Sequence, residues 1–368
     1  MTINYIHDII IVANIATGCK EVDLLQKNIT IYTIAEKLGV TPSMVSRAFN
    51  PNASINEEKR KLILETADKY NFVPNKLASR LSMHKIKIGV LVCWKFAPVS
   101  EKIVDGIKKA YKELADYKIQ LDITLVSFAE KKPEECEDEL NKYIDYDGVI
   151  LSGFGDVNSS EILKKFSEKN PNVVHVQNAP QDCEYLFASM HSPDIASALS
   201  AEFLYNCLKR SERKNILLLT GNPKSVLHRT AEAAFRESCR VFGLNLIEAV
   251  SKDDSGNELS DMIPSIFEKH RGMIDGIYIT TGNSVALCEY IYNNRIPVHL
   301  VTFDIHDKLN KYINNGTVSA TIYQNLEKQG RNAFEKLVHY LIKNEIPDKK
   351  IYTNVELIMK SNLGLYTY

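Results

Sequence analysis

The sequence predicts a small all-α head followed by a larger α/β body. Near the start, two short helical patterns flank Gly39, and a third helical pattern follows them. From residue 85 onwards, buried strand patterns alternate with amphipathic helical patterns, which is typical of right-handed βαβ units and doubly wound parallel sheets. This rhythm restarts after residue 191, so we expect two similar parallel-sheet subdomains in the body.

The composition is that of an ordinary globular chain. Its 368 residues, 45% hydrophobic and 25% charged, suffice for a small domain and one large or two medium ones. No apolar run reaches membrane-spanning length, and no signal-peptide arrangement is present. The seven cysteines are odd in number and lack any C-x-x-C pair, which indicates reduced thiols. We therefore expect a cytoplasmic protein with no membrane contact, no metal and no cofactor.

The head has the signals of a helix, a tight turn and a second helix. Residues 32–37 form an amphipathic pattern, and Gly39 supplies the left-handed backbone that a tight turn requires. Thr41 can cap a second helix over residues 42–49, with Pro42 at its first position. This geometry lays a recognition helix in the major groove of DNA. The inward-facing residues are Ile34, Ala35, Leu38, Val45 and Ala48.

A third helix and a distinct charge balance complete the head. Asn56 caps this helix, and Glu57 and Glu58 in its first turn suit the positive end of the helix dipole. Its apolar stripe is predicted to comprise Leu62, Ile63, Ala67 and Tyr70. Residues 29–87 carry ten Lys/Arg against five Asp/Glu, a net charge of +5, whereas the whole chain carries −1. A basic module on an acidic body is expected when only one end meets phosphate.

The segment from Thr30 to Leu81 resembles the DNA-binding segment of the lactose-repressor (LacI/GalR) family. The departures are Met44, where the family usually has Thr, and Pro42-Ser43 at its two variable positions. The residues in register with the family pattern are Thr30, Tyr32, Ala35, Gly39, Val40, Val45, Ser46, Arg47, Asn50, Pro74, Asn75, Ala78 and Leu81. The resemblance implies a homodimer that binds a near-palindromic operator in double-stranded DNA.

The resemblance also implies roles on DNA. Pro42, Ser43 and Arg47 would read bases, and Arg47 suits guanine O6 and N7 unless it only clamps a phosphate. Residues 76–82 resemble the family's hinge helix, in which Leu81 would wedge into the minor groove unless it packs on the body. The DNA-binding candidates are Thr30, Tyr32, Thr41, Pro42, Ser43, Ser46, Arg47, Asn50, Asn75, Ala78 and Leu81.

Residues 85–362 resemble the type I periplasmic-binding-protein fold, in which the chain passes three times between two subdomains. We expect residues 1–28 to be an N-terminal extension, and we favour the explanation that the start site is placed too early. Residues 29–73 are expected to form a DNA-binding domain, and residues 74–84 a hinge helix and linker. The expected sensor subdomains are about 85–190 with 320–346, and about 191–319 with 347–362.

In open α/β sheets, ligands bind at the carboxyl ends of the strands, here in a cleft between the subdomains. Asp304 and Gln324 match an Asp and a Gln that bind hydroxyls in sugar-binding members of this fold, although Asp304 could instead cap the next helix. Trp94 and Phe96 could stack on a ligand ring or pack at the subdomain edge. An arginine typical of the family is missing, and Arg229 and His228 are candidates to replace it. The ligand-binding candidates are Trp94, Phe96, Gln177, Asn178, Arg229, Asn283, Asp304 and Gln324.

Together these features predict a transcriptional regulator, a repressor, controlled by a sugar or sugar derivative. A solute-binding protein of a sugar uptake system is the alternative, but it would have an export signal and no basic head. An enzyme is disfavoured because the sequence lacks a P-loop, a G-x-G-x-x-G turn, H-E-x-x-H and G-x-S-x-G.

Overall fold

The computed structural model describes residues 30–49, 53–70, 72, 85–94, 97–127, 133–154, 160–180, 182–223, 225–250 and 256–366. The chain divides into two compact units between Met83 and His84, which we name the head and the body. In the described part of the chain, no helix is both long enough and apolar enough to cross a membrane.

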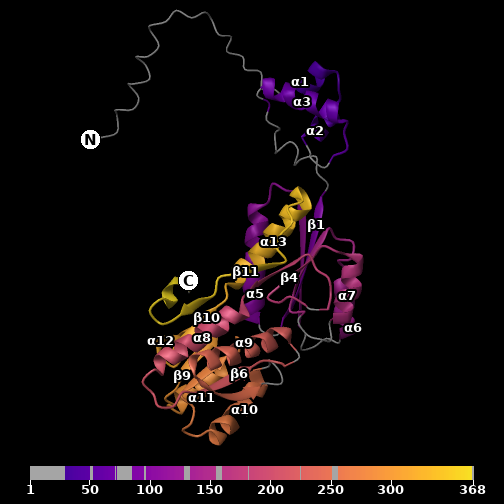
Figure 1. Cartoon of the computed structure of the whole chain (residues 1–368). Helices are drawn as coiled ribbons and strands as arrows, with labels where there is room; N and C mark the ends of the chain where they lie inside the picture. Colours follow the sequence, from indigo (N-terminus) through magenta and orange to yellow (C-terminus); the bar gives the residue numbers. More distant parts are fainter. Residues whose placement is uncertain are drawn as a thin grey trace, which may run out of the picture. The chain divides into compact units, whose positions relative to one another are not determined.

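The described residues of the head form three helices (Figure 1). Their bounds are α1 (Ile31–Leu38), α2 (Pro42–Ala48) and α3 (Glu57–Lys69). Gly39 follows α1 with a φ of 63°, the left-handed conformation that the sequence predicted. The Thr41 hydroxyl accepts a hydrogen bond from the Met44 N–H over 3.2 Å, and Asn56 caps α3 in the same way through Lys59. The predicted caps are therefore confirmed.

A small apolar core and one arginine hold these helices together. Arg60 on α3 donates to the carbonyl of Ala48 over 3.2 Å and to that of Ala53 over 2.7 Å, which ties α3 to the end of α2. The prediction that Leu62 faces the core is wrong: its side chain is 53% exposed, because α3 turns only Ile63 and Ala67 inward. The buried core is Ile34, Ala35, Val45, Ala48, Ile63, Ala67 and Phe72.

The body is built from two sheets, as predicted, and the described residues place six strands in each. In the first, the strand order is β11-β5-β4-β3-β1-β2 and all pairs are parallel. Its strands are β1 (Ile86–Trp94), β2 (Ile119–Ser127), β3 (Gly148–Ser152), β4 (Val173–Val176), β5 (Phe187–His191) and β11 (Lys350–Thr353). Its helices are α5 (Ala97–Glu113), α6 (Pro133–Asn141), α7 (Ser160–Lys169) and α13 (Leu326–Lys343).

The second sheet repeats this plan, with the order β12-β10-β9-β8-β6-β7. Among the described strands of this sheet, only β12 is antiparallel to its neighbour, β10. Its strands are β6 (Asn215–Thr220), β7 (Asn245–Val250), β8 (Gly276–Ile279), β9 (His299–Phe303), β10 (Ala320–Tyr323) and β12 (Glu356–Ile358). Its helices are α8 (Pro193–Cys207), α9 (Val226–Phe242), α10 (Gly256–Lys269), α11 (Val285–Asn293) and α12 (Asp307–Asn314), and a 3-10 turn, η2 (Leu363–Leu365), follows β12.

The chain passes between the sheets three times, after β5, after β10 and after β11. The predicted boundaries at 319/320 and 346/347 are therefore wrong, because β10 belongs to the second sheet and β11 to the first. A strand pattern shows that a segment is extended and buried, but it does not show which sheet receives it.

Alternating residues of the central strands face opposite layers. In β1, Val90 and Val92 pack with α5 and α13, whereas Leu91 and Cys93 pack with α7. In the second sheet, α8 and α9 cover one face and α10, α11 and α12 cover the other. Because both faces of each sheet are covered by helices, the strand ends are where polar side chains can meet a ligand.

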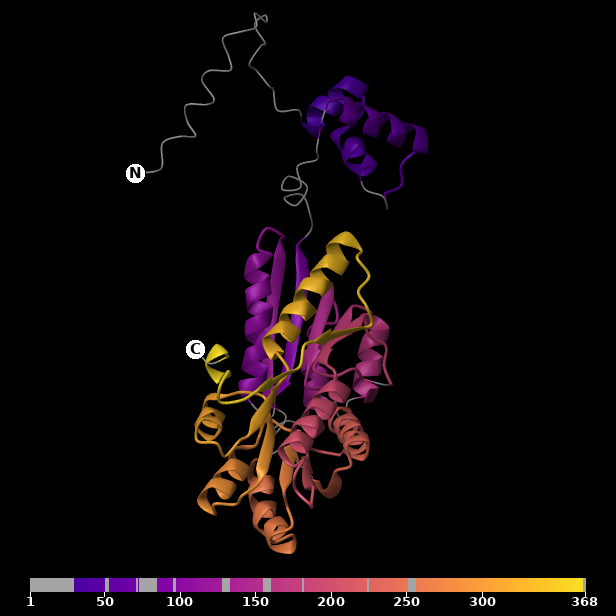
Figure 2. The ribbon, with the colours of Figure 1, turned by 60° about the vertical axis from the view of Figure 1, so that its left-hand side comes forward.

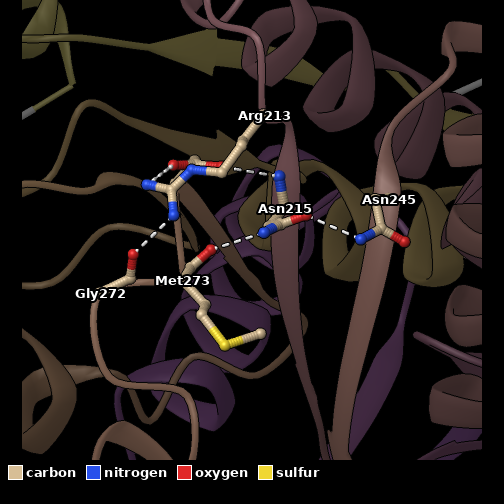
Figure 3. A network of polar contacts seen from close by, with 6 residues as sticks. Arg213, Asn215, Asn245, Gly272 and Met273 are labelled. Carbon is tan, nitrogen blue, oxygen red and sulfur yellow. Dashed lines mark hydrogen bonds and ion pairs between the residues drawn. The ribbon is translucent and has the colours of Figure 1, made fainter.

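The amino ends of the central strands are closed by matching aspartates. Asp147 accepts the backbone N–H of Lys87 at the start of β1 over 2.7 Å, and Asp275 accepts that of Asn215 at the start of β6 over 2.9 Å. Figure 3 shows the polar network around the start of β6, in which Arg213 also donates to the carbonyl of Gly272 over 2.9 Å. Arg213 also contacts Asp275 over 3.5 Å, and further bonds run from Asn215 to Met273 and from Asn245 to Asn215. The amino ends are thus used for structure, which leaves the carboxyl ends for binding.

Helices α5 and α13 cross in close contact, although more than two hundred residues separate them, and both views show them side by side (Figures 1 and 2). A Cβ on Gly106 would lie 1.9 Å from the Glu327 carbonyl oxygen, and one on Gly330 would lie 2.2 Å from that of Ile103. An ion pair of 2.7 Å between Lys109 and Glu327 supports the contact. The first turn of α13 is therefore held against the first subdomain.

Candidate functional site

In the head, α2 has one apolar face and one polar face. Val45 and Ala48 are buried, whereas Ser43, Ser46 and Arg47 are exposed. The Arg47 Nε donates to the carbonyl of Ser43 over 3.4 Å, so the guanidinium lies along the exposed side of the helix. The three exposed side chains can therefore reach a partner outside the head.

The predicted phosphate-binding residues of the head lie near the start of α1 and on α2. Tyr32 is 70% exposed, and Thr30 is exposed as well. Pro42 is half-buried at the first position of α2. The predicted DNA-binding residues Asn50, Asn75, Ala78 and Leu81 lie outside the described residues.

In the body, the structure brings Asp304 and Gln324 together, at the carboxyl ends of β9 and β10. The Gln324 Nε2 donates to Asp304 Oδ2 over 2.7 Å, and both side chains are buried. The alternative that Asp304 caps the next helix is wrong, because His306 holds the N-cap position of α12. The carboxylate is instead held by a neighbouring strand end.

Asp304 combines three unusual properties. Burial raises the pKa of its carboxyl to about 7, although the Gln324 hydrogen bond and the charge of Lys102 on α5 oppose this rise. Its backbone has a φ of 64°, which is uncommon for a residue other than glycine. Its second oxygen, Oδ1, is buried and has no hydrogen-bond partner. A buried acceptor left unpaired costs about 1–3 kcal/mol, so it marks where a ligand donor would be favourable.

Gln324 also contacts residues that the sequence did not single out. Gln329 Nε2, on α13, donates to the Gln324 carbonyl over 2.9 Å and lies 3.3 Å from its Oε1. The Thr353 hydroxyl at the end of β11 donates to the same carbonyl over 2.9 Å. His191, which ends β5, shares a side-chain hydrogen bond with Gln324. Three elements of the first subdomain thus converge on one residue of the second.

The first subdomain supplies a matching set of polar groups at its own strand ends. Ser152, ending β3, donates to Gln177 Oε1 over 3.1 Å. Gln177 is half-buried with a φ of 75°, and Asn178 is buried with an unpaired Oδ1. His191 is buried too, its Nδ1 is unpaired, and burial lowers the pKa of its imidazole to about 4. The neutral ring therefore offers a further acceptor.

The remaining predicted ligand-binding residues lie on other segments of the body. Arg229 on α9 is exposed and donates to the carbonyl of Pro223, which precedes this helix. His228 is buried, and its Nδ1 lies 3.4 Å from the Thr280 hydroxyl. Asn283 is half-buried, beside the buried Ser284. Trp94 ends β1, but its side chain lies outside the described residues, as does Phe96.

Sequence reasoning missed His191, His306, Gln329 and Thr353. His191 and Thr353 each end a strand, and this position would have identified them as it identified Asp304. His306 follows Asp304 closely, and its Nε2 lies 3.3 Å from the carbonyl of Gly282. Gln329 carries no such signal, since it is one polar residue in a helix that the sequence predicts to be amphipathic.

The unpaired buried atoms at these strand ends are mostly acceptors. Asp304 Oδ1, Asn178 Oδ1 and His191 Nδ1 can all receive hydrogen bonds. Such an arrangement favours a neutral, donor-rich small molecule, because each donated hydrogen bond would satisfy a buried group.

Comparison with known proteins agrees with this architecture. Residues 88–345 match the periplasmic binding protein domain family. The chain is 25% identical to the HTH-type transcriptional regulator pepR1 of Lactobacillus delbrueckii subsp. lactis over 345 residues, which are 92% of this chain and 98% of that protein. It is 34% identical to catabolite control protein A of Streptococcus mutans over 88 residues, 23% of this chain, and so spans about a quarter (26%) of that relative.

Among solved structures, one described as a LacI transcriptional regulator from Bacteroides fragilis superposes with a TM-score of 0.67. The identity is 19%, and the match covers 77% of this chain and all of that one. At this identity the likeness shows the fold alone. The resemblance to lactose-repressor regulators is confirmed by these relatives, and the chain belongs to the periplasmic-binding-protein domain family.

Proposed function

We propose that the protein is a sequence-specific DNA-binding transcriptional repressor whose affinity for DNA is controlled by a small polyhydroxylated ligand. The observation that carries this proposal is the combination of two features in one chain. The head presents an exposed polar face on α2 after a left-handed glycine turn. The body is a periplasmic-binding-protein domain with unpaired buried acceptors at its strand ends.

On DNA, α2 would lie in the major groove as the recognition helix. Arg47 would bind guanine, Ser43 would contact a base edge, and Pro42 could give only apolar contact, for instance to a thymine methyl. Thr30, Tyr32 and Ser46 would bind phosphates and set the register. Two copies would bind a near-palindromic operator as a homodimer in the cytoplasm. The roles of Asn50, Asn75, Ala78 and Leu81 remain part of this prediction.

The ligand would bind between the carboxyl ends of the two sheets. Asp304 and Gln324 would receive and donate hydrogen bonds on one side, and Gln177 and Asn178 on the other. A sugar or sugar derivative presents hydroxyl donors in the number and density that these acceptors require. Ligand binding would favour one arrangement of the two subdomains, and the head would respond as a population shift.

A solute-binding protein of a sugar uptake system is the second candidate, because the fold serves that role as well. The head favours the regulator: a transport protein has no use for an exposed arginine and serines on a capped second helix. Both candidates bind a ligand and release it unchanged.

A gel-shift assay with the DNA upstream of the protein's own gene tests the proposal. We expect a discrete complex that survives excess random DNA and that changes with at least one sugar of a panel of hexoses, pentoses and hexuronates. Absence of any complex at low salt on operator-like palindromes would exclude the regulator and leave the solute-binding candidate.

A further inference from the structure

Gln329 lies on α13, away from the strand ends that carry the candidate ligand-binding residues, yet its side chain is fully buried against one of them. Its Nε2 donates to the Gln324 carbonyl oxygen over 2.9 Å and lies 3.3 Å from the Gln324 Oε1. One amide group therefore contacts both the backbone and the side chain of Gln324.

This contact, together with the hydrogen bond that Gln324 shares with His191, favours one orientation of the Gln324 amide. A glutamine amide can rotate by half a turn, exchanging its oxygen and nitrogen, so its orientation depends on its partners. With Oε1 next to the Gln329 donor, Nε2 is directed to Asp304 Oδ2, 2.7 Å away. The reverse orientation would place donor against donor at Gln329 and acceptor against acceptor at Asp304.

Gln329 is itself held rigidly. The next residue, Gly330, makes the close backbone approach to Ile103 of α5, and Asn325 caps α13 through the Lys328 N–H over 3.1 Å. Gln329 therefore belongs structurally to the first subdomain, whereas Asp304 belongs to the second.

The buried amide is a costly choice for folding alone. Gln329 Oε1 is buried without a hydrogen-bond partner, and an unpaired buried acceptor destabilises the fold. Methionine has a similar volume and high helix propensity and would leave no such group. The Nε2 group gains hydrogen bonds to Gln324 whereas Oε1 gains none, so the amide contributes little net stability to the fold.

We propose that Gln329 is a positioning residue that orients the Gln324 amide toward Asp304 and so presets the ligand-binding carboxylate from the opposite subdomain. This inference rests on the proposed role of Asp304 and Gln324 in ligand binding. It adds that a residue of the first subdomain determines the hydrogen bonding, and thereby the pKa, of the Asp304 carboxyl on the second subdomain.

The state of Asp304 can be read without DNA or ligand, by titrating its carboxyl group. The hydrogen bond from Gln324 lowers the pKa of Asp304, against the larger effect of burial. Releasing the Gln324 amide should therefore raise that pKa further. The other titratable groups near Asp304 or its partner Gln324 are Lys102 on α5, Tyr278 on β8, Tyr323 on β10, His191 on β5 and His306.

The test is a pH titration by infrared difference spectroscopy of protein carrying 13C-carboxyl aspartate, with Asp304→Asn to identify the Asp304 band. We expect Gln329→Met to move the midpoint upward by roughly half a unit to one unit, in the direction of Gln324→Leu, which lacks the donor altogether. Thermal stability should change little, because the unpaired Gln329 oxygen is removed together with the donor, and the Thr353 hydroxyl still donates to the Gln324 carbonyl. Gln329→Leu gives the same comparison if the methionine variant does not fold.

A Gln329→Met titration that superimposes on the wild type, while Gln324→Leu shifts, would overturn the proposal. A marked loss of thermal stability in both Gln329 variants would overturn it as well, since it would make the residue structural. Because no DNA or sugar is present, these results are independent of whether the protein is a regulator.

Discussion

Gln177 and Asp304 occupy equivalent positions in the two sheets of the body. Each follows the end of its strand with a positive φ, 75° and 64° respectively. Each donates its backbone N–H to the neighbouring strand, Gln177 to Ser189 over 2.9 Å and Asp304 to Ile322 over 2.7 Å. Left-handed backbone outside glycine costs of order 1–3 kcal/mol and clusters at functional sites, so this matched pair supports a ligand site shared by the two subdomains.

Replacing Asp304 by asparagine should change how stability depends on pH. The pKa of Asp304 is about 7 in the fold against 3.8 as its ordinary value, so between these pH values the folded state retains a proton that the unfolded state has lost. The folded state is therefore penalised progressively as pH rises from about 4 to 7, by on the order of 4 kcal/mol in total. The asparagine side chain would keep the Gln324 hydrogen bond and carry no charge.

Urea unfolding of both proteins from pH 4 to pH 8 measures this effect. The stability of Asp304→Asn relative to the wild type should increase across that interval and level off above pH 7. Parallel curves for the two proteins would show that the carboxyl titrates normally.

Replacing His175 by phenylalanine should stabilise the body, most of all in acid. Both ring nitrogens of His175 are buried and unpaired, and burial, with a smaller contribution from Lys349, lowers its pKa to about 3. The unfolded chain binds a proton near pH 6.5 and the fold does not, so the wild type loses stability as pH falls from 6.5 toward 3. Phenylalanine keeps the edge-on ring contact with Tyr185, which has centroids 5.5 Å apart.

We expect a gain of about 1–3 kcal/mol at neutral pH and a shallower acid dependence, measured by urea unfolding at pH 5 and pH 7.5. A destabilised variant with the same acid dependence as the wild type would contradict this account of His175.

The crossing of α5 and α13 should tolerate no side chain at its two glycines. Gly106→Ala or Gly330→Ala would push the helices apart, because the added Cβ meets a backbone oxygen at 1.9 Å or 2.2 Å. We expect each to cost about 2–4 kcal/mol in unfolding free energy. Gly364→Ala is the matched control, since nothing lies within 4 Å of a Cβ at that position. Equal effects at all three positions would rule out the close crossing.

Arg47→Ala separates base reading from phosphate binding. If Arg47 reads guanine, the variant should lose about 1–3 kcal/mol of discrimination between operator and random DNA, measured by fluorescence anisotropy at fixed salt. Lys61→Ala is a control of equal charge change, on an exposed residue of α3. Equal weakening on both DNAs would instead make Arg47 a phosphate clamp.

Much of this architecture is predictable from the sequence, because the signal is strong wherever a single residue determines the local backbone conformation. Gly39 is required for a left-handed turn, and Thr41 followed by Pro42 marks a helix start, so the head could be drawn before its structure was known. The strand ends of β9 and β10 placed Asp304 and Gln324 at one edge of a parallel sheet, and the structure joins them directly.

What could not be predicted depends on contacts between distant segments. Sheet membership of β10 and β11 follows from the three crossings, which leave no mark in the strand patterns themselves. Gln329 matters only because Gly330 fits α13 against α5, a contact that spans more than two hundred residues of sequence. Leu62 looked like a core residue because it adjoins Ile63, but the direction in which α3 faces is set by its packing against α1 and α2.

The central claim is that ligand binding in the body controls DNA binding by the head. The most direct measurement is fluorescence anisotropy on operator DNA, with and without the sugar that best protects the wild type from thermal unfolding. The account predicts a change in operator affinity of at least about fivefold, the lower end of ordinary allosteric coupling, and no change in Asp304→Asn. The same operator affinity with and without a sugar that demonstrably binds the wild type would contradict it.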